Sequence, residues 1–69
     1  MKNKVRILRK ELGLRQEDVA ERAGVTRQTV IAIENDKYDP TLSLAFRLAH
    51  ILGTTVDALF FPDFNNERM

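Results

Sequence analysis

The sequence of 69 residues has no cysteine, no tryptophan, three glycines and two prolines. Without cysteine, neither a disulfide nor a cysteine-built metal site can stabilise the fold. A chain of about 60 residues buries only roughly 60% of the surface that its unfolded form exposes, so its stability is marginal. Tight helix packing and oligomerisation remain as sources of stability, and one all-helical domain over residues 1–69 suits this length.

Long hydrophobic runs are missing as well. No segment approaches the ~20 apolar residues that a membrane span requires. Charged residues interrupt the first ten positions too often for the apolar core of a signal peptide. The sequence therefore predicts a cytoplasmic protein that does not contact a membrane.

The net charge is only +1, but the charged residues are unevenly distributed. Residues 1–37 hold nine Lys/Arg and six Asp/Glu, whereas residues 38–69 hold two Lys/Arg and four Asp/Glu. The first part is therefore basic and the second acidic, which favours one face for an anionic partner and another face for a different contact. A difference of this size is equally compatible with chance.

Apolar residues recur at helical spacing in five short segments. The first helix is expected between an N-cap at Asn3 and a stop at Gly13, with Val5, Leu8 and Leu12 inward. Threonines are expected to cap the third, fourth and fifth helices, at 26, 41 and 55. The later helices are predicted over 16–23, 27–35, 42–52 and 56–60. Their expected inward residues are Val19, Ala20, Ala23, Val30, Ile33, Leu44, Ala45, Leu48, Ala49, Leu52, Val56 and Leu59.

The second and third helices are joined by Gly24, Val25 and Thr26 alone. This connection is too short for an antiparallel hairpin of packed helices, and it suits the bent arrangement of a helix-turn-helix. Ala20 is small where the two helices cross, and Gly24 permits a positive φ at the turn. The spacing therefore predicts a compact five-helix bundle that contains a helix-turn-helix.

The outward face of the third helix carries side chains suited to reading base edges. Arg27 can bond bidentately to guanine and Gln28 to adenine, and Ile31 and Ala32 can touch a thymine methyl group. Recognition helices use their N-terminal residues in this way. The alternative is that Arg27 and Gln28 are ordinary solvated residues, but Ile31 is unusual on a merely solvated face.

The combined pattern resembles the phage repressor and Cro type of helix-turn-helix domain, the prokaryotic xenobiotic-response-element family. It is most similar to the short dimeric regulators of that family, such as the cytolysin repressor. The resemblance covers residues 4 to 61. It is carried by Leu8-Arg9, Gly13-Leu14, Gln16-Glu17-Asp18-Val19-Ala20, Gly24-Val25-Thr26-Arg27-Gln28-Thr29-Val30, Ile33-Glu34-Asn35, Lys37-Tyr38 and Pro40.

The resemblance implies a lambda-repressor-like fold and a nucleoid-associated, sequence-specific regulator of transcription, a repressor that binds palindromic double-stranded DNA as a homodimer. It implies a structural ion pair between Arg9 and Glu34. The residues implied to face bases are Thr26, Arg27, Gln28, Ile31 and Ala32. Those implied to hold the sugar-phosphate backbone are Gln16, Thr29, Asn35, Lys37 and Tyr38.

Two positions depart from the family pattern. Arg15 stands where the family usually has a capping Ser or Thr, which weakens the cap of the second helix, although Arg15 could reach a phosphate instead. Asp36 replaces the more common glycine after Asn35 and places a negative charge near the DNA.

Other functions are less well supported by the residues. The one histidine, His50, has no nearby Cys and no His partner, so catalysis or metal binding lacks support and no cofactor is expected. No small-molecule effector is evident. The alternative to DNA-binding regulation is an antitoxin or adaptor that acts through protein–protein contact, although the tail after Pro62 is short for wrapping a toxin.

Residues 56–64 are expected to form the dimerisation segment. Phe60, Phe61 and Phe64 cannot all pack inward from a short helix and its tail, and an exposed aromatic cluster is typical of an interface. Met1 to Lys4 could add a small strand pair with Phe60 to Phe64. In the competing interpretation, Phe60 or Phe61 folds back over the first helix and the protein is a monomer.

Overall fold

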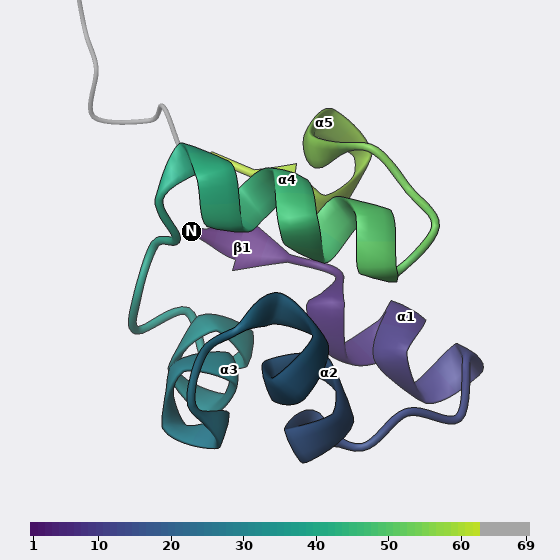
Figure 1. Cartoon of the computed structure of the whole chain (residues 1–69). Coiled ribbons are helices and arrows are strands. Elements are labelled where there is room, and N and C mark those ends of the chain that lie inside the picture. Colours follow the sequence, from purple (N-terminus) through teal and green to yellow (C-terminus); the bar gives the residue numbers. More distant parts are fainter. Residues whose placement is uncertain (63–69) are drawn as a thin grey trace, which may run out of the picture.

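The computed structural model describes residues 1–62. These residues form five helices and two short strands around one core (Figure 1). The elements are β1 (Lys2–Asn3), α1 (Val5–Glu11), α2 (Gln16–Ala23), α3 (Arg27–Glu34), α4 (Leu42–Ile51), α5 (Val56–Leu59) and β2 (Phe60–Phe61). The predicted helical bundle and the strand pair of the chain ends are both confirmed.

Three threonines begin helices as their residue type predicts. The hydroxyl oxygens of Thr26, Thr41 and Thr55 each accept a hydrogen bond from the backbone N–H three residues further on, at 3.3 Å. Each bond satisfies one of the N–H groups that a helix N-terminus leaves without a partner. Gly24 ends α2 with a φ of +73°, the left-handed conformation that a glycine adopts without steric cost.

Asn3 caps α1 in a different way from the one expected. Lys4 occupies the N-cap position, and Asn3 belongs to β1. The Asn3 Oδ1 nevertheless accepts a hydrogen bond from the N–H of Val5 at 3.0 Å. The strand pairing of β1 moves the helix start by one residue, while the side chain still satisfies the first N–H group.

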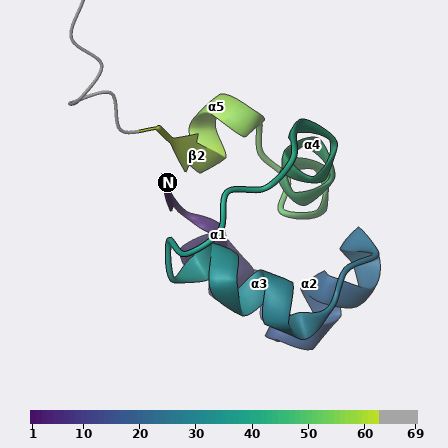
Figure 2. The ribbon, with the colours of Figure 1, turned by 90° about the vertical axis from the view of Figure 1, so that its left-hand side faces the viewer.

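The core lies between α4 and the layer formed by α1, α2 and α3, with α5 closing one end (Figures 1 and 2). The inward residues predicted for α2, α3 and α4 are all buried, and so is Leu59 of α5. The prediction for Leu12 is wrong, because its side chain is 54% exposed. Helix α1 ends at Glu11, so Leu12 is no longer held on the inward face, and Leu14 packs against the core instead.

The strand pair places the two adjacent phenylalanines in different environments. β1 and β2 pair antiparallel, with Lys2 opposite Phe61 and Asn3 opposite Phe60. Successive side chains of a strand point to opposite faces. Phe60 is therefore buried, and Phe61 is exposed beneath the Lys4 ammonium, which lies 5.5 Å from the centre of its ring.

The expectation that Phe60 is exposed is thus wrong for the single chain, since Phe60 belongs to the core. Its part in a dimer interface stays a prediction. Phe64, the third aromatic residue of that expectation, lies outside the described residues.

No helix in the described part of the chain is both long and apolar enough to cross a membrane.

Candidate nucleic-acid interface

The three-residue connection bends the chain so that α3 lies on the surface. Residues 24–26 join α2 to α3, and the N–H of Val25 bonds back to the carbonyl of Ala20 at 3.0 Å. Val30 and Ile33 anchor α3 in the core, and both are 1% exposed. This packing leaves the opposite face of α3 directed outward.

The residues expected to read bases gather at the N-terminal end of α3 and along this outer side. Arg27 and Gln28 are exposed, and Ile31 and Ala32 are half-buried. Thr26 is exposed too, but its hydroxyl is engaged with the N–H and the hydroxyl of Thr29, at 3.3 and 3.1 Å. The arrangement leaves the arginine and glutamine head groups accessible to a partner.

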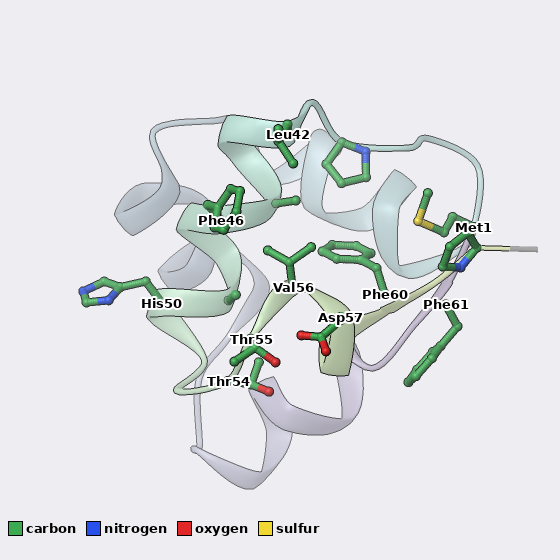
Figure 3. Close-up of a pocket in the computed structure, with 14 residues that line it drawn as sticks. Met1, Leu42, Phe46, His50, Thr54, Thr55, Val56, Asp57, Phe60 and Phe61 are labelled. Atoms are coloured by element: carbon green, nitrogen blue, oxygen red, sulfur yellow. The ribbon is translucent and has the colours of Figure 1, made fainter.

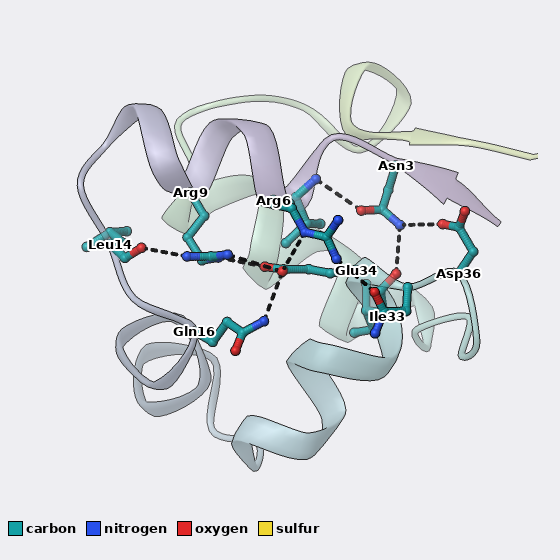
Figure 4. Close-up of polar contacts among 10 residues, drawn as sticks. Asn3, Arg6, Arg9, Leu14, Gln16, Ile33, Glu34 and Asp36 are labelled. Atoms are coloured by element: carbon teal, nitrogen blue, oxygen red, sulfur yellow. Dashed lines mark hydrogen bonds and ion pairs between the residues drawn. The ribbon is translucent and has the colours of Figure 1, made fainter.

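The other end of α3 is held by the buried carboxylate of Glu34, whose side chain is 0% exposed (Figure 4). Arg9 of α1 donates to it through Nε at 2.6 Å and through Nη2 at 3.2 Å. Arg6 and Gln16 also donate to Oε1, at 3.4 and 3.1 Å. The ion pair implied by the resemblance is present, and it ties α1, α2 and α3 together.

Burial by itself raises the pKa of Glu34. The hydrogen bonds from Arg9, then Gln16 and Arg6, act in the opposite direction and prevail, so the pKa of this carboxyl lies below its ordinary value. Glu34 is consequently ionised at neutral pH.

Arg9 also donates from Nη1 to the carbonyl of Leu14 at 2.9 Å, and this hydrogen bond fixes the turn between α1 and α2.

The N-terminus of α2 lies beside this network. Gln16, an expected phosphate contact, uses one amide hydrogen for Glu34. Arg15 makes no side-chain cap for α2, as its residue type predicts, but the Asp18 carboxylate accepts the Arg15 N–H at 2.8 Å. The hydrogen bonds from the Arg15 side chain and backbone hold the pKa of Asp18 below its usual range.

Basic side chains surround a cleft of about 480 Å³ between α1 and the start of α2. Its residues are Arg6, Arg9, Lys10, Leu14, Arg15, Gln16, Glu17 and Arg27. Arg15 is tied to Glu17 and Asp18, at 3.2 and 3.3 Å. Lys10 and Arg27 have no ion pair within residues 1–62, so their charges are available to an anion.

The segment after α3 carries the remaining expected backbone contacts. Asn35, Lys37 and Tyr38 are exposed. Asp36 adopts a φ of +60°, a left-handed conformation that a glycine adopts without steric cost, in agreement with the glycine that the resemblance implied here. The amide of Asn3 donates to the Ile33 carbonyl at 2.9 Å and to Asp36 at 3.3 Å, and so fastens the segment to β1.

A second surface lies on the other side of the molecule, between α4 and the α5–β2 end (Figure 3). It is an open, mainly apolar groove of about 1060 Å³. Leu42 and Phe46 of α4 border it and are 69% and 59% exposed, and Phe61 is 41% exposed. Sequence reasoning missed Leu42 and Phe46, although their spacing of four places them on one helix face beside the core stripe.

An exposed helix held by a three-residue turn against a second helix defines the helix-turn-helix class of domains. The chain matches the family model described as helix-turn-helix over residues 5–59, and it belongs to this Cro/C1-type family. The family is a class of DNA-binding transcription regulators.

Relatives of this chain carry the names of transcription regulators, and two of those below match over nearly their whole length. An HTH-type transcriptional regulator of Methanothermobacter thermautotrophicus is 58% identical over 91% of this chain and 93% of its own length. One from Methanocaldococcus jannaschii is 50% identical over 87% of this chain and 91% of its own. The immunity repressor protein of Bacillus phage phi105 is 38% identical over 81% of this chain and 39% of its own length.

Among solved structures, the crystal structure of FeII HppE superposes with a TM-score of 0.75 at 30% identity. The match covers 94% of this chain and 36% of that chain. This chain therefore spans about a third of that longer protein, and the likeness concerns the helical region that the two share.

Proposed function

We propose that this protein regulates transcription as a homodimeric repressor that binds a palindromic operator through α3. The observation that carries the proposal is the exposed N-terminal end of α3. Arg27 and Gln28 are exposed there, beside the half-buried Ile31 and Ala32. These are the side-chain types that distinguish base pairs in the major groove. The names of the relatives, among them a phage immunity repressor, support the same function.

Contacts to the DNA backbone are proposed for residues on either side of the reading helix. Arg15, Gln16 and Thr29 lie near the N-terminal ends of α2 and α3, and Asn35, Lys37 and Tyr38 follow α3. Lys10, which has no ion pair within residues 1–62, adds positive charge at the cleft between α1 and α2. Such contacts set the orientation of the protein on the duplex without reading its sequence.

Dimerisation is proposed to use the apolar groove and Phe61. One reading helix spans only a few base pairs, whereas a two-fold dimer reads two half-sites about one helical turn, or ~34 Å, apart. Leu42, Phe46 and Phe61 are exposed and border one apolar groove, and an apolar patch of this kind is typical of a protein–protein contact. The groove is bordered by α4 and the α5–β2 end (Figure 3), whereas α3 belongs to the other layer of the molecule (Figure 2). A second copy seated in the groove would therefore leave α3 uncovered.

A selection of bound duplexes from a random pool tests the proposal. Enrichment of an inverted repeat, with half-sites about 10 base pairs apart, is the expected result. A pool that remains random at low and high salt would overturn sequence-specific binding. Repression is tested separately, by placing the selected site across a reporter promoter, where expression should fall when the protein is present.

A further inference from the structure

Arg6 connects two residues of the candidate interface and was not among the residues expected there. Its Nη2 donates to the Oδ1 of Asn35 at 2.7 Å. Its Nε donates to the Oε1 of Glu34 at 3.4 Å (Figure 4). Arg6 lies in the first turn of α1, whereas Asn35 directly follows α3. The contact therefore joins the start of one helix to the end of another.

We infer that Arg6 is a positioning residue, which turns the Asn35 amide so that its NH₂ group faces a DNA phosphate. The inference rests on the proposed function, because it assumes that Asn35 meets the DNA backbone. It deepens that function by naming the residue that prepares this contact.

The chemistry of the two side chains determines the orientation. A guanidinium has only donors, so the Asn35 atom that faces it must be the carbonyl oxygen. The Nδ2 group, with its two N–H donors, then lies on the other branch of the planar amide. A phosphate oxygen can only accept hydrogen bonds. If the amide turned over, it would present an oxygen to an oxygen, and the contact would be repulsive.

The Glu34 carboxylate holds the Arg6 guanidinium in place beside the Asn35 carbonyl oxygen. The Glu34 side chain is 0% exposed, while that of Arg6 is 49% exposed, so the carboxylate is a fixed anchor for a half-exposed arginine. The flat guanidinium offers separate N–H groups to Glu34 and to Asn35 at once. A lysine ammonium is a single point donor on a flexible stem and matches this planar arrangement poorly.

Lys10 provides a matched control on the same helix. It stands one turn after Arg6, is exposed, and borders the same cleft. Within the described residues its side chain makes no hydrogen bond or ion pair. Replacing Lys10 removes one positive charge from this face and leaves the Asn35 contact in place.

The first test uses the free protein and needs no DNA. The Asn35 Nδ2 resonances are followed by ¹H–¹⁵N NMR in wild type, Arg6→Met, Arg6→Lys and Lys10→Met. We expect both Arg6 variants to shift these resonances and to lower the side-chain order parameter, and Lys10→Met to leave them in place. Unchanged Asn35 resonances in Arg6→Lys, the more conservative variant, would overturn the inference.

The second test is a double-mutant cycle on DNA affinity, with the selected duplex as the probe. Arg6→Met and Asn35→Ala should each weaken binding about five-fold, and the double variant should be no weaker than either. The losses from Lys10→Met and Asn35→Ala should multiply. Multiplying losses for Arg6→Met and Asn35→Ala would show that Arg6 contacts the phosphate by itself, and would overturn the positioning role.

Failure of the inference differs from failure of the proposed function. A wild-type protein that binds no duplex refutes DNA regulation, whatever the NMR spectra of Asn35 show. A wild-type protein that binds its selected site, with independent contributions from Arg6 and Asn35, refutes only the positioning role.

Discussion

Glu34 shows how a single buried charge organises three helices. Its carboxylate accepts hydrogen bonds from Arg6, Arg9 and Gln16, and the described residues contain no buried side-chain polar atom without a partner. Replacing buried ion pairs by apolar groups is often neutral, but the removal of one partner leaves the other charge uncompensated. The network is therefore sensitive to single substitutions.

We expect Glu34→Ala to lower the free energy of unfolding by about 3–5 kcal/mol, because Arg9 then remains buried without its counter-charge. Urea unfolding followed by circular dichroism measures this loss. Arg27→Ala, at an exposed position, serves as the control and should lie within about 0.5 kcal/mol of wild type. If the two variants unfold at the same urea concentration, the ion pair does not contribute to stability.

The lowered pKa of Glu34 makes part of the stability depend on pH. The folded-state pKa is below the ordinary value of about 4.3, so the unfolded chain binds a proton more readily. The contribution of Glu34 is complete above that ordinary value and is lost as the pH falls through the folded-state pKa. Unfolding measured between neutral and strongly acidic pH should show a steeper loss in wild type than in Glu34→Gln.

Asp36 is held in a conformation that most residues avoid. Its φ of +60° is ordinarily a glycine conformation. We expect Asp36→Gly to be more stable than Asp36→Ala by about 1 kcal/mol, because both lose the contact with Asn3 but only alanine keeps a Cβ. Thermal unfolding of the two variants provides the comparison, and equal melting temperatures would argue against strain at this position.

The two ends of helix α3 differ in how they are held. The N-terminal end exposes Arg27 and Gln28, whereas the C-terminal end is fastened through Glu34 to α1 and α2. A helix that is fixed at one end and packed along one side presents its free side chains in a constant orientation. Such pre-organisation lowers the cost of ordering these groups when they bind.

We expect Arg27→Ala to weaken binding to the selected site by about 1–3 kcal/mol and to relax the choice of base at one position. Lys37→Ala is the comparison variant, since it should weaken binding to all duplexes alike and reduce the salt slope by ~1. Fluorescence anisotropy on specific and random duplexes measures both. An equal loss for Arg27→Ala on the two duplexes would remove this residue from base reading.

The whole molecule has two faces of different character. The surface around α3 and the cleft beside α2 carries basic and polar side chains, whereas the groove bordered by Leu42, Phe46 and Phe61 is apolar. We proposed the first face for DNA because basic side chains attract anionic phosphates. The second face has the composition of a protein–protein contact.

We expect wild type to sediment at twice the chain mass of 7.9 kDa and Phe46→Glu to sediment as a single chain. The glutamate would place an unpaired charge in an apolar contact, which strongly disfavours association. Leu12→Glu is the control, because Leu12 is similarly exposed but lies at the end of α1, outside the groove. A Phe46→Glu dimer would move the interface elsewhere, and a wild-type monomer would exclude the dimer.

The sequence by itself determined the features that depend on neighbours within a few residues. The helix positions, the capping threonines and the buried stripes of α2, α3 and α4 follow from i to i+4 relations, which the local pattern displays. The Arg9–Glu34 pair was accessible through the resemblance, because a family pattern carries information about contacts that are distant in the chain.

Only the tertiary structure decided the contacts between residues that are far apart in sequence and are not part of the pattern. The pairing of β1 with β2 turned Phe60 inward and Phe61 outward. The approach of α1 to the end of α3 brought Arg6 to Asn35, and the packing of α4 left Leu42 and Phe46 exposed beside the groove. These outcomes depend on how whole elements pack, and packing depends on all side chains of the core together rather than on any local run of residues.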